Sequence, residues 1–514
     1  MLTGLVGCGG AGSTAETAET STTSGTSAST SGTPTTGGSV TDGPCAEPID
    51  PVERSHARLR VDTMGVLRDG LGRDIQLRGV NAGGRSKWAP FMPFPMSEDA
   101  SLDEVKAGAA AFFAPLPGWG LDTVRVPFSW EALEPVEGMY DERYLDRYVA
   151  MVDAAWALGL RVIVDFHQDV YASPFCGDGF PLWTISGEVG PPRRDCPDWG
   201  LGYIIDPGVR EAFDRFWADE GGVQGKYRKM WEKMASRVAT HPGVLALELI
   251  NEPGWGTAPN INAWKASTLT PFHTQMIAHM RGVVGDELLL VFNNTGVEAA
   301  GLSPTVHMRP EGTNLMYGPH MYDGGLVGGE LYAGHEPEVH MASLAEFSRA
   351  EGVAPLIGEF GYNIVADEAG TAGASWLTRV VDALDAERVS GTLWEYSRNE
   401  ALWNEEDLSL VDAAGVPRPI LDVYVRPYLR AVAGGSPSFH WDVATGTGVA
   451  RWVGDGGVTE VVVPVRSFPD GLSELSLETE AGAPGSCYYH DAARGELRVR
   501  VTPGAQVELR FKRE

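Results

Sequence analysis

The sequence predicts an α/β fold, a (β/α)8 barrel of parallel strands alternating with helices, followed by an antiparallel β-sandwich. Two observations indicate the barrel. Eight short runs rich in Val, Ile and Leu recur along the chain, and helix-like segments lie between them. A third observation indicates the sandwich, because apolar and polar residues alternate with period two over residues 433–514.

The eight apolar runs are the predicted barrel strands, and most of them end in polar or aromatic residues. They are IQLRGVN (75–81), DTVRVPF (122–128), RVIVDFH (161–167), VLALELINEP (244–253), LLLVFNN (288–294), NLMYGPHMY (314–322), APLIGEFGY (354–362) and GTLWEYS (391–397). Residues 142–159 and 225–239 are typical of the helices between them. Apolar and polar residues alternate over residues 59–80, and Asp-Gly pairs typical of turns interrupt them. This pattern predicts one or two β-hairpins.

The chain is expected to divide into three segments. Residues 1–45 form a lipobox-like N-terminus and tether, residues 46–432 the barrel, and residues 433–514 the sandwich. The tether is almost entirely Ser, Thr, Gly and Ala and has no Lys, Arg or aromatic residue between Gly9 and Pro44. Such a segment cannot bury enough apolar area to offset its ordering entropy, so we expect it to be disordered.

The charge of the chain excludes some classes of partner. It has 69 acidic and 40 basic residues, a formal net charge of -29. A nucleic-acid binder needs a basic face for phosphates, and docking on anionic lipid needs a polybasic patch. We therefore expect neither. We also expect a monomer.

The stretch Leu5-Val6-Gly7-Cys8 resembles the lipobox of bacterial lipoproteins. The resemblance implies lipidation of Cys8 and an exported protein, held on the cell surface or secreted. The alternative is a chance match, because no basic residues precede it and the apolar stretch is short.

Four further cysteines, Cys45, Cys176, Cys196 and Cys487, permit disulfide bonds in an exported protein. Cys176 and Cys196 share one long loop, rich in Pro and Gly, and are the expected pair. Cys45 would then pair with Cys487, although four cysteines allow three pairings and could also remain unpaired thiols. Their spacing does not suggest a structural zinc site.

Chemistry-bearing residues follow six of the predicted strands, and in such a barrel all of these ends lie on one face. They are Arg125, His167, Asp169, Asn251, Glu252, His320, Tyr322, Glu359 and Trp394. Burying two carboxylates without a function would cost several kcal/mol each unless they were paired. Since strict alternation puts Asn251 and Glu252 on opposite faces, both can face the site only if the strand bulges or ends there.

The set of NEP after the fourth predicted strand, HMY after the sixth, EFG after the seventh and a Trp after the eighth resembles glycoside hydrolase family 5. VRVPF and DFHQD extend the match, which covers roughly residues 60–430. The resemblance implies a retaining glycosidase in which Glu252 is the acid/base and Glu359 the nucleophile. It also implies that Asn251 binds the sugar 2-hydroxyl, that Arg125 and Tyr322 contact the nucleophile, that His320 lies beside them, and that Trp394 is the floor of the sugar pocket.

The phrase DFHQDVYASPFCGDGFPLW is similar to the endoglycoceramidase branch of that family. The resemblance implies cleavage between glycan and ceramide of a glycosphingolipid, with His167, Asp169 and Lys87 contacting sugar. The runner-up is a β-glucanase, a β-mannanase or a glycosidase of galactosylceramide, glucosylceramide or steryl glucoside. No cofactor or metal is expected.

Two apolar loops belong to the face where substrate would bind. Residues 88–96 contain Trp88, Phe91, Met92 and Phe94, and residues 180–183 contain Phe180, Leu182 and Trp183. An exposed apolar rim, including Trp183, could receive the lipid and contact a membrane or micelle surface. The alternative is that these side chains pack under their own loops.

Two rival functional classes remain. Asp165, His167 and Asp169 share one strand face at period two, which is compatible with metal ligands and a metal-dependent hydrolase. A carbohydrate-binding protein with an inactive barrel is the other rival, and the presence of both carboxylates opposes it.

Overall fold

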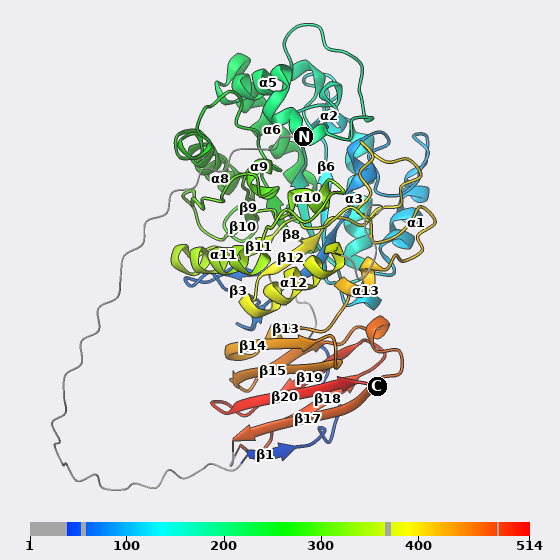
Figure 1. The fold of residues 1–514 in the computed structure, drawn as a ribbon, viewed down its shortest axis with the longest axis vertical. Helices are drawn as coiled ribbons and strands as arrows, with labels where there is room; N and C mark the ends of the chain where they lie inside the picture. Colours follow the sequence, from blue (N-terminus) through cyan, green and yellow to red (C-terminus); the bar gives the residue numbers. More distant parts are fainter. Residues whose placement is uncertain (1–38, 53–57, 365–371, 481–482) are drawn as a thin grey trace, which may run out of the picture. The chain divides into compact units, whose positions relative to one another are not determined.

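The computed structural model describes residues 39–52, 58–364, 372–480 and 483–514. Within them, eight parallel strands close a barrel in chain order, which confirms the predicted fold class (Figure 1). Each predicted run overlaps one barrel strand. The strands are β5 (Arg78–Asn81), β6 (Thr123–Phe128), β7 (Arg161–Phe166), β8 (Val244–Glu248), β9 (Leu289–Phe292), β10 (Leu315–Tyr317), β11 (Ala354–Ile357) and β12 (Ser390–Leu393).

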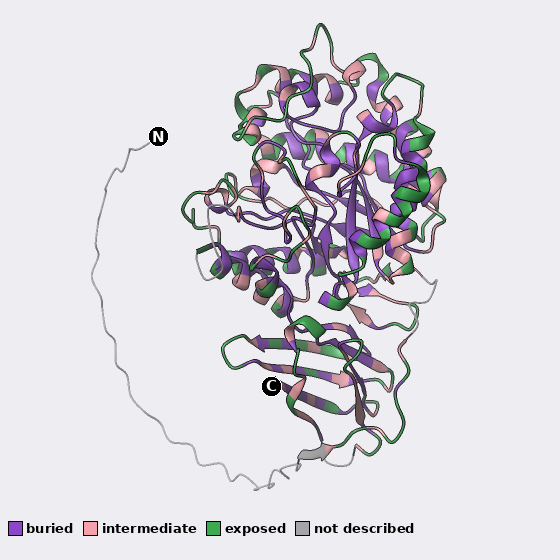
Figure 2. Cartoon of the chain, turned by 90° about the vertical axis from the view of Figure 1, so that its right-hand side faces the viewer, coloured by how far each residue is buried: buried purple, intermediate pink, exposed green. Residues whose placement is uncertain are grey.

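Helices connect the barrel strands, with buried faces toward the strands and exposed faces outward (Figure 2). The long ones are α1 (Leu102–Phe113), α3 (Glu142–Ala157), α5 (Pro207–Trp217), α6 (Val223–Val238), α8 (Thr270–Val284), α11 (Pro337–Glu351) and α12 (Ala372–Glu387). Ser101 and Glu104 form a capping box at the start of α1, and the Asp141 side chain caps α3. These side chains satisfy backbone N–H groups that the first helical turn leaves unpaired.

Apolar side chains fill the end of the barrel opposite the C-terminal strand ends. Ile163, Leu289, Leu356 and similar residues pack there with Leu59 and Leu67, which come from the segment before the first barrel strand. That segment therefore packs against the apolar filling of the barrel. The charged residues described below occupy the opposite, C-terminal strand ends, where the strands and the loops that follow them both supply side chains.

The C-terminal strands form two antiparallel sheets. One has the order β1 (Ser39–Asp42), β17 (Leu472–Glu480), β20 (Gln506–Arg513), β15 (Thr447–Gly454) and β14 (Gly434–Asp442). The other has the order β18 (Cys487–Asp491), β19 (Glu496–Arg500), β16 (Val458–Val462), β13 (Tyr428–Val432), β4 (Asp74–Ile75), β3 (Leu67–Arg68) and β2 (Arg60–Val61). Trp441, Trp452 and Phe511 are buried between them.

Strands from both ends of the chain share these sheets. The predicted hairpin at 59–80 supplies β2 to β4, and β4 pairs with β13. Arg73 of this segment contacts Glu460 of β16 at 2.9 Å. The sheet crosses the expected boundary between residues 432 and 433, because β13 also pairs with β16. Alternation reveals a strand but not its partner. The limits 1–45, 46–432 and 433–514 stay predictions.

Two disulfide bonds join the cysteines of the described residues. One links Cys176 to Cys196 and the other Cys45 to Cys487, the two pairings favoured by the sequence. Cys8 and its predicted lipidation lie outside the described residues.

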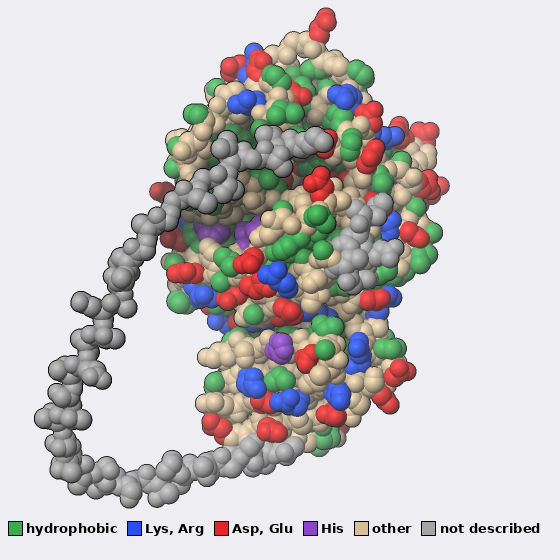
Figure 3. All heavy atoms as spheres, in the orientation of Figure 1, with side chains coloured by type: hydrophobic (Ala, Val, Ile, Leu, Met, Phe, Trp, Pro, Cys, Tyr) green, Lys and Arg blue, Asp and Glu red, His purple; other side chains and the backbone are tan. Residues whose placement is uncertain are grey.

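Acidic and basic side chains are interspersed over the visible face of both parts of the fold (Figure 3). Among the described residues, no helix is long and apolar enough to cross a bilayer.

Candidate active site

Arg125 of β6 lies at the centre of the polar group at the strand ends. Its side chain is fully buried and donates two hydrogen bonds of 2.7 Å to the carboxylate of Glu248. It also donates to Asn81 at 2.9 Å and to Asn251 at 2.8 Å. A fifth bond, of 2.6 Å, reaches Glu359. One guanidinium therefore fixes four side chains from β5, β8 and the segments after β8 and β11, which its planar fork of donors suits.

Glu359 follows β11 and is held by two donors. Arg125 Nη1 lies 2.6 Å from its Oε1, and the Tyr322 hydroxyl donates to its Oε2 at 2.8 Å. Both interactions favour the ionised carboxylate. The arrangement suits a nucleophile, which must carry charge to attack.

Asn251 and Glu252 lie in a turn beyond the end of β8. The strand stops at Glu248, and Glu252 adopts a left-handed φ of 35°. Both side chains reach the Arg125–Glu359 group because the strand alternation no longer applies to them. Because β8 ends before Asn251, both side chains can face the site, although strict strand alternation would put them on opposite faces.

Glu252 is placed to remain protonated near neutral pH. Burial, assisted by the negative charge of Asp169, raises the pKa of Glu252 to about 8. One of its carboxyl oxygens lies within 4.8 Å of one of Glu359. Retaining glycosidases have their two carboxyl groups ~5–5.5 Å apart, whereas inverting enzymes separate them by ~6.5–9.5 Å. The spacing fits the retaining class.

His320 lies between the two carboxyl groups. Burial lowers its pKa to about 4, so the ring is neutral at pH 7. The Asn293 amide donates to the Glu248 carboxylate at 2.7 Å and to His320 Nε2 at 3.2 Å. Because Nε2 accepts, Nδ1 carries the hydrogen and donates to Glu252 Oε1 at 2.8 Å. We infer that the Glu252 proton then resides on Oε2.

Trp394 forms an aromatic wall beside these groups. Its ring stacks on His167 with centroids 5.2 Å apart, and its indole N–H donates to Glu406 at 2.6 Å. A Cβ on Gly83 would lie 2.5 Å from the ring, so this position admits only glycine. The Lys87 ammonium lies 4.5 Å from the ring centre.

Lys87 begins a buried chain of charges. It contacts Asp169 at 2.6 Å, and His167 lies between Asp169 at 3.4 Å and Asp165 at 2.8 Å. Burial opposes charge on Asp169, but Lys87 and His167 together outweigh it and lower the pKa of Asp169 to about 2. Burial likewise opposes charge on His167, yet its two carboxylate neighbours hold the pKa of His167 well above its usual value. Burial raises the pKa of Asp178 to about 7.

The structure buries part of the expected apolar rim, whereas Trp88, Phe91 and Leu182 are half-buried. Met92, Phe94 and Phe180 are buried under their own loops, because each side chain packs into the main core. Trp183 is half-buried, packs edge-on against Trp130, and its indole N–H donates to the carbonyl of residue 134 at 2.9 Å. A substrate-binding role for Trp183 stays a prediction.

The site residues that were not predicted from the sequence include Glu248, Gln168 and Glu406. Glu248 lies inside a strand that reads as apolar, and its pairing with Arg125 needs the closed barrel. Gln168 stands inside the HQD motif, which was a usable signal. Glu406 comes from an acidic run in a loop, 3.8 Å from Lys87, and such runs usually face solvent.

Two buried clusters have ligand-type atoms within 4.8 Å of one another: His167, Asp169 and Asp178, and Glu252, His320 and Glu359. These are the places where a metal ion could be held. In each cluster a cation of the protein already contacts a carboxylate, Lys87 in the first and Arg125 in the second. Those contacts supply the positive charge that a metal would bring.

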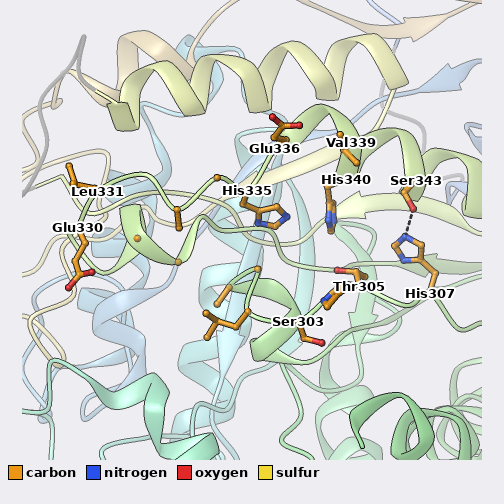
Figure 4. A pocket seen from close by; sticks show the side chains of 18 residues that line it. Ser303, Thr305, His307, Glu330, Leu331, His335, Glu336, Val339, His340 and Ser343 are labelled. Atoms are coloured by element: carbon orange, nitrogen blue, oxygen red, sulfur yellow. Dashed lines mark hydrogen bonds between the residues drawn. The ribbon is translucent and has the colours of Figure 1, made fainter. Parts of the chain in front are cut away.

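A cavity of about 770 Å³ lies between the loop after β9 and the loop after β10 (Figure 4). His335, His340 and His307 follow one another along it, and Leu302, Leu331 and Val339 add apolar surface. Its wall adjoins the site through the backbone: His335 contacts the carbonyl of Tyr322, and the Tyr322 N–H donates to the carbonyl of Ala299 at 2.7 Å.

Two curated relatives share part of the chain. Endoglycoceramidase I of Rhodococcus hoagii is 35% identical over 192 residues, which are 37% of this chain and 36% of that protein. Glucosylceramidase of Aspergillus fumigatus is 35% identical over 152 residues, 26% of this chain and 19% of that protein. The chain therefore spans less than two thirds of the length of these relatives.

A solved structure matches over a longer range. Endo-glycoceramidase II from Rhodococcus sp., in complex with ganglioside GM3, superposes with a TM-score of 0.67 at 26% identity. The match covers 88% of this chain and 99% of that chain. The cellulase family model matches residues 85–400, which include Arg125, Glu252 and Glu359. This chain belongs to glycosyl hydrolase family 5.

Proposed function

We propose that this protein is a retaining endo-β-glycosidase that hydrolyses the bond between the glycan and the ceramide of glycosphingolipids. One observation carries the reaction type. Two carboxyl groups lie within 4.8 Å of each other, one raised in pKa by burial and the other held by a guanidinium and a phenol. Opposite environments of this kind separate an acid from a nucleophile.

The proposed reaction runs in two displacements. A carboxylate oxygen of Glu359 attacks C1 of the sugar as Glu252 Oε2 gives its proton to the leaving oxygen, and ceramide departs. Glu252 then takes a proton from water, whose oxygen attacks C1 and releases Glu359. Asn251, fixed by Arg125 at 2.8 Å, is proposed to bind the 2-hydroxyl.

Variants of the two carboxyl residues test this mechanism. Glu359→Gln is expected to reduce turnover of 2,4-dinitrophenyl β-glycosides by at least ~10³-fold, because the nucleophile is lost. Glu252→Ala should retain the first step on the same substrate and regain rate with azide, which needs no base. Undiminished turnover in Glu359→Gln would refute the assignment, and loss of activity with EDTA would favour the metal-dependent rival.

Two features support a glycolipid substrate. The curated relative and the solved structure are named for glycoceramide cleavage. The cavity beside Tyr322 has apolar residues at its wall, and Leu302, Leu331 and Val339 are 64–89% exposed. We propose that this cavity receives the lipid and that its rim, rather than loops 88–96 and 180–183, contacts the micelle surface.

A glycosidase of glucosylceramide is the second candidate, favoured by the similarity to the Aspergillus fumigatus protein. The endo-glycosidase and the glucosylceramide glycosidase differ in whether a second sugar is bound. Lys87 lies against the Trp394 ring and contacts Asp169 and Glu406, and we propose these groups as donors and acceptors for such a sugar. We therefore expect lactosylceramide to be cleaved in preference to glucosylceramide.

A substrate panel decides between these functions. Lactosylceramide, glucosylceramide, galactosylceramide, a steryl glucoside and cellohexaose are incubated separately, and free ceramide or reducing sugar is measured. Intact lactose from lactosylceramide is the expected result. Preference for glucosylceramide would select the second candidate, and cleavage of cellohexaose alone would select a glucanase.

We also propose an exported, monomeric protein anchored through Cys8. The lipobox-like stretch and the two disulfide bonds support export. Labelled palmitate should enter the full chain in a bacterial host and not the Cys8→Ser variant. Light scattering should give a monomer mass.

A further inference from the structure

Gln168 stands between His167 and Asp169, yet the proposed mechanism gives it no part. Its side chain is fully buried. Its amide nitrogen lies 2.8 Å from the carbonyl oxygen of Asn251 and 2.9 Å from that of Glu252. The Tyr203 hydroxyl lies 3.1 Å from the same nitrogen. The amide thus holds the backbone of the two residues that carry the proposed chemistry.

The contacts between the two strand ends are reciprocal. The Asn251 side chain donates to the backbone carbonyl of Gln168 at 3.1 Å, and the Asn251 N–H donates to the carbonyl of Phe166 at 2.9 Å. The Gln168 side-chain oxygen accepts from the N–H of Tyr171 at 3.0 Å. Both ends of the amide are engaged, so its orientation is determined.

The packing around Gln168 leaves it little freedom. A Cβ on Gly179 would lie 2.5 Å from the Cβ of Gln168, so the loop backbone passes directly against this side chain. Gly179 has a φ of 104°, which other residues rarely adopt. The loop after β7 therefore packs directly against Gln168.

The turn that Gln168 contacts needs such support. Glu252 has a φ of 35°, which is unfavourable for a residue with a Cβ. Such a conformation persists only where the surrounding structure imposes it. His320 holds the Glu252 carboxyl group, but Gln168 holds the peptide carbonyls on either side of its N–Cα bond. The hydrogen bonds to these two carbonyl oxygens therefore restrict rotation about φ of Glu252.

We propose that Gln168 is a positioning residue that fixes the Asn251–Glu252 turn and so keeps the proton of Glu252 directed at the leaving oxygen. The proposal rests on the proposed acid role of Glu252. It assigns Gln168 no contact with substrate. Without the amide, the turn would relax and proton delivery would fail, while the attack by Glu359 would remain.

Substrates with different leaving groups separate positioning from general damage. Gln168→Met keeps the length of the side chain and removes both donors. We expect its kcat/KM on lactosylceramide, whose alkoxide leaving group needs the proton, to fall by at least ~10²-fold, the usual contribution of general acid catalysis. On dinitrophenyl lactoside, whose leaving group needs no proton, the fall should be less than about 5-fold.

Gln76 offers a matched control. It is equally buried, and its amide donates to two backbone carbonyls, those of Leu384 at 2.9 Å and Val389 at 3.0 Å, at the opposite end of the barrel. Gln76→Met should lower the melting temperature and leave the ratio of the two kcat/KM values unchanged.

The outcomes are distinct. A selective loss on lactosylceramide in Gln168→Met supports the proposal, and an equal loss on both substrates, or no loss in a folded variant, overturns it. If Gln168→Met does not fold, Gln168→Glu is measured in the same way. A wild-type protein inactive on every β-glycoside would instead refute the proposed function.

Discussion

At the scale of single residues, the site separates two chemically identical side chains by their surroundings. Glu359 accepts from Arg125 and Tyr322, while Glu252 is enclosed without a cation in contact among the described residues. The first environment stabilises charge and the second opposes it. The roles follow from these surroundings, since both residues follow similar apolar strands.

The raised pKa of Glu252 predicts an alkaline limit to activity. Glu252 is protonated below about pH 8 and loses its proton above it, so kcat/KM on an alkyl or ceramide glycoside should fall as the pH rises through about 8. The rate on a dinitrophenyl glycoside should lack this limb. A pH profile of both substrates measures it.

The control is Glu252→Gln, which cannot release a proton. Its residual rate on the dinitrophenyl glycoside should show no change near pH 8. Persistence of the alkaline limb in that variant would assign the limb to another group.

At the scale of elements, the loop after β7 packs beside Lys87 and Trp403. Asn404 accepts from the N–H of Cys196 at 3.0 Å and donates to the carbonyl of Cys176 at 2.7 Å, so it joins both sides of the disulfide. Trp199 of the same loop packs on Trp403, whose ring centre lies 3.9 Å from the Lys87 ammonium. The disulfide therefore supports the surroundings of Lys87.

Removing this disulfide should weaken substrate binding. We expect the double variant Cys176→Ser and Cys196→Ser to raise KM for lactosylceramide by about 3- to 10-fold and to lose about 3 kcal/mol of stability, as for a loop of this size. Steady-state kinetics and thermal unfolding measure the two effects.

The second disulfide is the comparison, because it lies in the C-terminal sheets. Cys45→Ser with Cys487→Ser should lower stability without changing KM. An equal rise in KM for both double variants would contradict a specific role for the Cys176–Cys196 loop.

At the scale of the whole molecule, the barrel and the C-terminal sheets share backbone and charge contacts. Arg388 follows α12 and donates to Gln76 at 2.9 Å, to Asp74 at 2.8 Å and to the carbonyl of Leu429. Its guanidinium joins the helix layer, the hairpin before the barrel and the sheet strand after it. These contacts couple the parts during unfolding.

We predict that residues 39–514 unfold in one cooperative transition and that Arg388→Ala destabilises it by about 1–3 kcal/mol, because buried acceptors lose their donor. Calorimetry measures both. Arg451→Ala removes an exposed ion pair with Glu508 and should change stability by less than about 1 kcal/mol. Two separate transitions in the wild-type protein would show that the parts are independent.

The sequence determined the barrel, because periods of apolar residues decide strands and helices locally, and it placed Arg125, Glu252 and Glu359 at strand ends on one face. Only the tertiary structure decided what contacts them. Gln168, Glu248 and Glu406 enter the site because closure of the barrel brings distant segments within hydrogen-bond reach. The hairpin before the barrel and the strands after it share a sheet for the same reason, since strand pairing depends on chain path and not on local pattern.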